Sequence, residues 1–257
     1  MTRPPWLGLI PAALLLVISV WEIGATRCAA DAVPGDAAWA DAAKVVRAGH
    51  QPGDLIVFAP DWIDPVGRLN LGDLIPVDMA ARTDAARYGR IWELSIRGAR
   101  SADTAGLAPV LTEDHGGVTV RRFDRPPATI VTDLRDVLPE ATIQGSVRVD
   151  LVEVGFTPKR CVLATGGARI TVPAFELGTE LVGYVGIADV FTRRDQRQPA
   201  VLDVLVGGTR VAGATAGVDD GWVRFAAPTT PGRAEVTVAV RSETRGRLIC
   251  VALEARR

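Results

Sequence analysis

The sequence has little of what most enzymes use for catalysis. It contains two histidines and three cysteines, and aromatic residues make up 5% of it. No GxSxG elbow, HExxH pair, P-loop or Rossmann glycine fingerprint occurs, and the cysteines form neither a CxxC nor a zinc-type spacing. We therefore expect no catalytic residue, no metal and no cofactor. The net charge of −1 comes from interspersed acids and bases, which argues against a nucleic-acid partner.

The chain also has only one long apolar run, Trp6–Trp21. Its length lies between the roughly 20 residues of a membrane-spanning helix and the roughly 7–15 of a signal-peptide core. A small-x-small cleavage site is poor, with Cys28-Ala29-Ala30 the best candidate and Ile23-Gly24-Ala25 weaker. An uncleaved signal anchor over residues 1–30 is favoured; a cleaved signal, giving a secreted protein, and a lipid anchor at Cys28 are the alternatives.

Charges beside the run predict its orientation. Arg3 lies before it, whereas Glu22, Asp31 and Asp36 largely offset Arg27 after it. Since cytoplasmic flanks tend to be positive, we expect the N-terminus in the cytoplasm and the globular part outside, in the periplasm or at the cell surface.

Residues 31–127 are predicted to form a small α/β domain. A helix is expected over residues 36–49, with Asp36 as N-cap, and a broken helix over residues 71–88. A strand buried on both faces follows Pro52-Gly53. Residues 99–114 are expected to be a loop or a loose helix. The strands are predicted at residues 54–60, 90–96 and, as an edge strand, 117–123.

Residues 146–257 change to short segments that alternate apolar and polar side chains. Glycine pairs such as Gly166-Gly167 and Gly207-Gly208 separate them as hairpin turns. This pattern predicts an antiparallel β-sandwich, specifically a jelly roll, after a linker at 128–145. The fold class is thus α+β multidomain. The predicted strands are 147–154, 169–172, 180–190, 200–206, 209–214, 221–226, 235–242 and 248–255.

A resemblance to a known family lies between Trp39 and Gly98. An amphipathic helix with Trp39, then Gly53-Asp54-Leu55-Ile56-Val57, a proline-containing loop, and Tyr88 before an Ile91-Trp92 strand resembles the soluble tail of bacterial membrane glycosyltransferases of the protein-mannosyl and aminoarabinose transferase type. The resemblance implies a small Rossmann-like layer and an extracytoplasmic compartment. It implies no activity, because the multi-helix membrane domain that carries the family's catalytic acids has no counterpart here.

The first candidate binding site is Asp61, Trp62 and Asp64, which follow the buried strand at residues 54–60. The carboxyl ends of strands are where open α/β sheets bind ligands, and two acids with an aromatic face suit a sugar or a cation. The alternative, which we favour, is a structural loop with Trp62 buried against the helix that carries Trp39.

The second candidate site is Asp219, Asp220 and Trp222, at the start of a sandwich strand. An exposed Trp222 would stack on a sugar ring while the acids bind its hydroxyl groups. The alternative, again favoured, is a Trp222 packed into the sandwich. His115, in a Glu-Asp-His-Gly-Gly loop, is interpreted as part of a solvated turn rather than as a base or a metal ligand.

Cys161 and Cys250 lie near the two ends of the predicted sandwich. Because the first and last strands of a Greek-key sandwich are often neighbours, these residues are placed to form a disulfide in an oxidising compartment. Two buried thiols are the alternative.

The leading hypothesis is a membrane-anchored, extracytoplasmic binding or assembly protein without catalytic activity. The partner would be a glycan or an envelope protein. A carbohydrate-binding accessory of a glycosyltransferase or polysaccharide system is the second hypothesis. An extracytoplasmic hydrolase is the third, and it lacks a visible nucleophile–base pair.

Overall fold

The computed structural model describes residues 10–31, 33–193 and 196–257, and the chain forms two compact units. The first unit contains the chain up to Gly72 together with Arg90–Asp124. The second contains Asp73–Gly89 and Arg125–Arg257. This division differs from the predicted boundaries at 127 and 146. Residues 73–89, which were predicted to belong to the α/β domain, belong to the second unit, and that unit resumes at Arg125.

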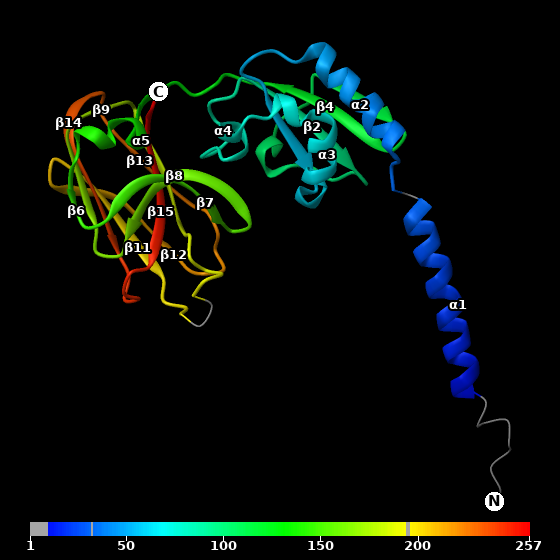
Figure 1. Ribbon diagram of the computed structural model, residues 1–257. Helices are drawn as coiled ribbons and strands as arrows, with labels where there is room; N and C mark the ends of the chain where they lie inside the picture. Colours follow the sequence, from blue (N-terminus) through cyan, green and yellow to red (C-terminus); the bar gives the residue numbers. More distant parts are fainter. Residues whose placement is uncertain (1–9, 32, 194–195) are drawn as a thin grey trace, which may run out of the picture. The chain divides into compact units, whose positions relative to one another are not determined.

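The N-terminal helix α1 (Ile10–Asp31) carries most of the predicted apolar run (Figure 1). Its stretch Pro11–Ala30 is long and apolar enough to cross a membrane, with a mean hydropathy of 1.5, a test that a signal sequence also passes. None of that stretch is buried within the protein. The start of the predicted run, residues 6–9, lies outside the described residues.

The first unit is built on a four-stranded sheet of order β1-β2-β4-β3. β1 and β2 are parallel, with Leu55 opposite Ile91, whereas β4 pairs antiparallel with β2 and with β3. All five residues of β1 are buried, as its continuous apolar sequence predicts. The strands are β1 (Leu55–Ala59), β2 (Arg90–Ile96), β3 (Leu111–His115) and β4 (Val118–Asp124).

Two helices pack on this sheet. α2 (Asp36–Gly49) buries Trp39, Ala42, Ala43 and Val46, while α3 (Asp64–Leu71) follows the 3₁₀ turn η2 (Asp61–Ile63). Gly67 of α3 lies so close to the Phe58 ring of β1 that an added Cβ would be 2.0 Å from its Cε1 atom. The missing side chain thus allows α3 to approach β1 closely.

Four predictions for residues 31–127 are wrong. Residues 111–115 form strand β3, although their polar sequence, Leu-Thr-Glu-Asp-His, reads as a loop; the strand lies at the sheet edge and keeps these side chains accessible. β4 is consequently internal rather than an edge strand. Gly35, and not Asp36, is the N-cap of α2. The broken helix over 71–88 is reduced to η3 (Gly72–Leu74) and the single turn α4 (Val77–Ala80).

The second unit is a sandwich of two antiparallel sheets, as the alternating pattern predicts. One sheet has the order β13-β10-β15-β8-β7, with β5 also paired to β15, and the other has the order β12-β11-β14-β9-β6. The strands are β5 (Ile130–Asp133), β6 (Thr142–Gln144), β7 (Val147–Val154), β8 (Thr157–Thr165), β9 (Arg169–Leu177), β10 (Glu180–Ile187), β11 (Ala200–Val206), β12 (Thr209–Ala216), β13 (Val223–Pro228), β14 (Gly232–Arg241) and β15 (Leu248–Arg256).

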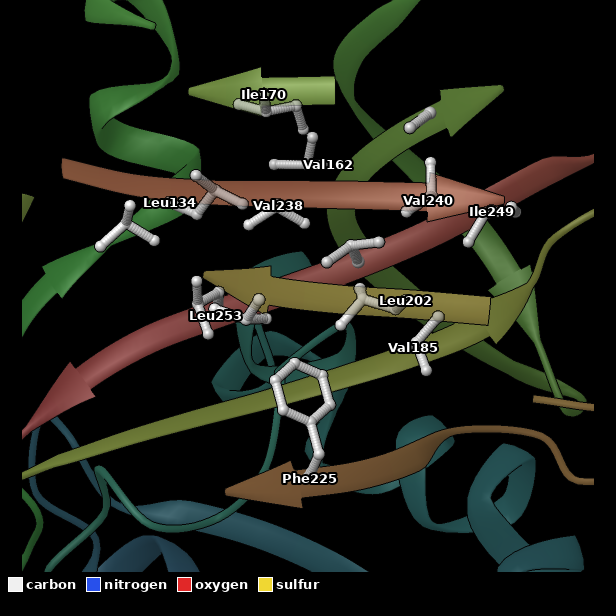
Figure 2. Packing of buried hydrophobic residues seen from close by; sticks show 14 of the residues in the cluster. Leu134, Val162, Ile170, Val185, Leu202, Phe225, Val238, Val240, Ile249 and Leu253 are labelled. Atoms are coloured by element: carbon white, nitrogen blue, oxygen red, sulfur yellow. The ribbon is translucent and has the colours of Figure 1, made fainter. Parts of the chain in front are cut away.

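Branched aliphatic side chains from both sheets fill the space between them. Val162, Val185 and Leu253 come from the first sheet, and Ile170 and Val238 from the second (Figure 2). Each is at most 1% exposed. Burial of such side chains contributes roughly 1.5–3 kcal/mol each relative to exposure, so this core accounts for most of the unit's favourable folding free energy.

The predicted linker at 128–145 belongs to the sandwich. Within it, β5 pairs with β15, the turn α5 (Leu134–Val137) buries Leu134, and β6 pairs with β9. The sequence prediction also omits β8, whose start, Thr-Pro-Lys-Arg, is polar. Its second half, Cys161–Ala164, is fully buried.

Candidate functional site

Residues 77–87 are bound to the sandwich by several contacts, and the largest group of them converges on the partly buried Asp84 carboxylate. Asp84 accepts hydrogen bonds from the Tyr184 hydroxyl at 2.8 Å, from Arg256 Nη2 at 2.9 Å and from the Ala86 N–H at 2.8 Å. Burial acts to raise the pKa of the Asp84 carboxyl, but these partners outweigh it and hold that pKa below its ordinary value. Burial and the nearby Asp84 charge in turn raise the pKa of the Tyr184 phenol.

Beside this attachment lies a concave pocket of about 330 Å³, which we call the arginine pocket. Its wall is almost entirely charged, with Val149 as the one aliphatic side chain. Guanidinium groups outnumber carboxylates, four to three. The residues that line it are Asp78, Arg82, Thr83, Arg87, Asp133, Arg135, Asp136, Val149 and Arg160.

The four arginines are held to different degrees, and Arg82 donates to the Met79 carbonyl at 3.0 Å. Arg135 is fixed, because it forms a fork-like pair with Asp133 and donates to the Arg160 carbonyl at 3.0 Å. Arg87 is half-exposed and lies 3.3 Å from Glu254 and 3.7 Å from Asp133. Arg160 is half-exposed and pairs at 2.6 Å with Asp78, which is itself mostly exposed. Exposed ion pairs contribute little to stability and exchange partners readily, so Arg160 can release Asp78 for a ligand. Arg87 is available to a ligand through its exposed part, while it keeps its buried partners Glu254 and Asp133.

Thr83 adds an unusual polar atom to the same pocket. Thr83 is 6% exposed. Its Oγ1 atom is among the few buried side-chain polar atoms in the described residues that have no hydrogen-bond partner. Its carbonyl, in contrast, accepts from Trp222 Nε1 at 3.1 Å. Buried hydroxyl groups are normally satisfied. The Thr83 hydroxyl is an exception, in a residue that lines the pocket.

Trp222, a predicted site residue, lies behind this wall. Its indole stacks on the Tyr184 ring, with centroids 5.5 Å apart and planes 8° apart, and Lys159 Nζ lies 5.7 Å from the indole. It also packs against the cluster that contains Cys161 and Cys250, which are joined by a disulfide with Cα atoms 5.6 Å apart. The indole is therefore engaged on several sides.

The two acids next to Trp222 are used locally. Asp219 forms an ion pair with Arg197, and Asp220 accepts a hydrogen bond from the Gly217 N–H at 2.7 Å. The latter closes the turn before β13. Asp219, Asp220 and Trp222 therefore each have a different partner within the protein.

The other predicted cluster, in the first unit, has a different environment from the one expected. Trp62 is 65% exposed rather than buried against the helix that carries Trp39. Asp64 pairs with Arg68 at 2.5 Å on the same helix, and Asp61 is exposed. The expectation of a buried Trp62 is wrong, because Ile63, Gly67 and Leu71 supply the buried side of this segment.

The buried acids of the first unit have structural partners. Glu93 is fully buried between Arg100 and Arg121, each 3.1 Å away, and accepts from the Ser101 N–H at 2.8 Å. Asp54 accepts from Trp92 Nε1 at 2.9 Å. His115 lies 3.3 Å from Glu113. Among the described residues no group of three or more His, Cys, Asp or Glu side chains is arranged to hold a metal ion.

An aromatic pair protrudes from the sandwich at the β7–β8 hairpin. Phe156 is 81% exposed, and its ring contacts Phe191 edge-to-face at a centroid distance of 5.2 Å. Phe156 has a φ of 65°, a left-handed conformation that is costly for a bulky residue. Neither residue was a candidate in the sequence, since isolated phenylalanines give no pattern.

Comparison with known proteins identifies no family. No family model and no curated protein sequence matches the chain. Among solved structures, the CBM51-2 and INT domains of Clostridium perfringens ZmpB are similar at a TM-score of 0.39 and 17% identity, over 53% of this chain and 34% of that one. The CBM51 of Clostridium perfringens GH95, in complex with methyl-galactose, gives a TM-score of 0.37 and 12% identity, over 48% and 100%.

A third similar structure is the carbohydrate-binding module CBM36 in complex with calcium and xylotriose. Its TM-score is 0.32 and its identity 11%, over 49% of this chain and 98% of that one. This chain spans about a third of the first of the three structures. All three similarities are weak, so the function is inferred below from this chain's own residues.

Proposed function

We propose that this protein is a membrane-anchored, extracytoplasmic binding protein whose sandwich takes an acidic carbohydrate in the arginine pocket. The observation that carries the proposal is the pocket wall, where two half-exposed guanidinium groups, Arg87 and Arg160, line the same pocket as Thr83. No catalytic step is part of the proposal.

The chemistry of the wall favours a charged polyol over an apolar ligand. Guanidinium groups bind carboxylates and phosphates with two parallel hydrogen bonds, and carboxylates such as Asp136 accept from sugar hydroxyl groups. Val149 is too small an apolar surface for a hydrophobic ligand. An anionic group that displaces the exposed Asp78 from Arg160 would exchange one ion pair for another, at little cost.

The compartment and the remaining fold assignments belong to the same proposal. The apolar α1 supports anchoring with the sandwich outside the cytoplasm, and the disulfide suits an oxidising compartment. The parallel β1–β2 pair, with α3 against β1 and α2 against β4 and β3 of the same sheet, supports a Rossmann-like layer related to the transferase tails. The alternation of strands between two antiparallel sheets supports the jelly-roll assignment.

Calorimetric titration of the full chain in nanodiscs tests the proposal. A glucuronate-containing oligosaccharide is compared with a glucose oligosaccharide of the same length. We expect binding of the acidic sugar alone, weakened at least tenfold by Arg87→Ala and by Arg160→Ala. Arg210→Ala, at an exposed ion pair with Asp203 elsewhere on the sandwich, is the matched control and leaves binding unchanged. Equal binding of both sugars, or of neither, contradicts the proposal.

A further inference from the structure

Helix α3 and the turn before it expose a continuous apolar face. Trp62, Val66 and Leu69 are 65%, 38% and 86% exposed. Their spacing of i, i+4 and i+7 places them on one side of the helix. We call these three residues the α3 face.

The α3 face cannot be explained as a misplaced core. Ile63, Gly67 and Leu71 already bury the opposite side of the segment, and Gly67 fits directly against the Phe58 ring. Rotation of α3 to bury Trp62 would therefore expose Ile63 and Leu71 and force Gly67 away from Phe58. A single exposed apolar residue is ordinary, but three on one helix side form a patch of the kind that contacts another apolar phase.

The short connection between α1 and α2, which tethers the first unit to α1, indicates that the apolar phase is the membrane. α1 ends at Asp31 and α2 begins at Asp36, so even a fully extended connection spans about 18 Å. If α1 crosses the bilayer, the first unit is held next to the lipid headgroups at all times. A tether of this kind replaces a bimolecular association by an intramolecular one, and a contact of only three side chains then suffices.

The residue types and charges of this segment also agree with the membrane interface as the surface that the α3 face contacts. Tryptophan is enriched at membrane–water interfaces, and Trp with Leu on one helix side is typical of segments that lie in the interface. Arg68, the one basic side chain within residues 61–71, is paired with Asp64, and Asp61 is exposed. The contact would thus be apolar, without a requirement for anionic lipids.

We propose that the α3 face inserts into the interface of the membrane that α1 spans and so fixes the first unit against the bilayer. This inference rests on the anchoring part of the proposed function and is independent of the arginine pocket.

Spin-label accessibility in the full chain tests the inference. Cys28 is the free cysteine in the described part of the chain and is replaced by serine. A label is then attached at Leu69→Cys, or at Thr112→Cys on the exposed surface of β3 as matched control. The protein is reconstituted into phosphatidylcholine nanodiscs, and collisions with oxygen, which concentrates in lipid, are compared with collisions with a water-soluble nickel complex.

We expect the oxygen-to-nickel collision ratio to be several-fold higher at position 69 than at position 112, and unchanged when phosphatidylglycerol is added. Co-elution with nanodiscs but equal ratios at both positions overturns the docking and leaves the anchoring intact. A label at position 69 shielded from both reagents indicates a protein partner and also overturns the docking. Failure to co-elute overturns the anchoring itself.

Discussion

The hydroxyl group of Tyr184 donates a hydrogen bond to the Asp84 carboxylate at 2.8 Å, across 100 residues of sequence. Arg256 donates to the same oxygen atom. The two bonds attach residues 73–89 to strands β10 and β15, although the chain between them forms the strands β2, β3 and β4 of the other unit. The segment that supplies Arg82, Thr83 and Arg87 to the arginine pocket is thereby held in place.

The attachment through Asp84 predicts that the free energy of unfolding depends on pH. Since the pKa of Asp84 in the folded state lies below its ordinary value of about 3.9, its ion pair contributes stability above that pH and loses it as the pH falls through the folded-state pKa. Asp84→Asn should cost about 1–3 kcal/mol at neutral pH, and the difference from wild type should narrow as the pH falls below about 4. Urea unfolding of both proteins at several pH values measures this difference in the free energy of unfolding. A difference that does not change with pH contradicts the prediction.

Thr83→Val separates stability from binding. The substitution removes a buried hydroxyl without a partner and replaces it by a group of similar shape. The variant should therefore be as stable as wild type or up to about 1 kcal/mol more stable, while its affinity for the acidic oligosaccharide falls. Urea unfolding and calorimetric titration provide the two measurements. A destabilised variant would mean that the hydroxyl has a structural partner, such as a buried water.

The Cys161–Cys250 disulfide closes a loop with a sequence separation of 89 residues. Because a cross-link over so long a loop restricts the unfolded chain strongly, replacement of both cysteines by alanine should lower the free energy of unfolding by about 4 kcal/mol. Cys28→Ala, at the exposed free cysteine, is the control and should change nothing. Equal stability of the double variant and wild type would show that the loop is already restricted in the unfolded state.

Trp222 is predicted to act through packing. Trp222→Ala removes the stack on Tyr184 and the contacts with the disulfide cluster, so it should cost about 2–4 kcal/mol. Trp222→Phe keeps an aromatic ring but loses the hydrogen bond to the Thr83 carbonyl, at about 1 kcal/mol. An alanine variant that melts like wild type but no longer binds sugar would instead identify Trp222 as a ligand platform.

The sequence predicts the sandwich well because strands such as β11 and β13 have one buried and one more accessible side, so that polarity alternates along them. β7 and β11 have the predicted bounds. β3 was missed because four of its five residues are polar, which an edge strand tolerates. β8 was missed because Lys159 and Arg160 precede its buried half.

The arginine pocket could not be predicted from the sequence. Thr83, Asp133 and Arg160 are far apart in the chain, and they meet only because residues 73–89 join the sandwich. Local patterns carry no information about such a long-range arrangement. The nearest signal was the density of arginine and aspartate between residues 78 and 87, which does not indicate the distant residues that complete the pocket.

Trp62 shows the opposite failure, in which a general preference for buried tryptophan gave the wrong environment. On the expectation that Trp62 is buried, Trp62→Ala would cost about 3–5 kcal/mol. Because the side chain is 65% exposed, we instead expect a change within about 0.5 kcal/mol. Trp39→Ala is the matched control, since Trp39 is 3% exposed and its loss should have the larger cost.

In nanodiscs, Trp62→Ala should also make a spin label at position 69 collide more often with the water-soluble nickel complex, because the α3 face then loses its largest apolar group. A stability loss as large as that of Trp39→Ala would contradict both the exposure of Trp62 and its availability to the membrane.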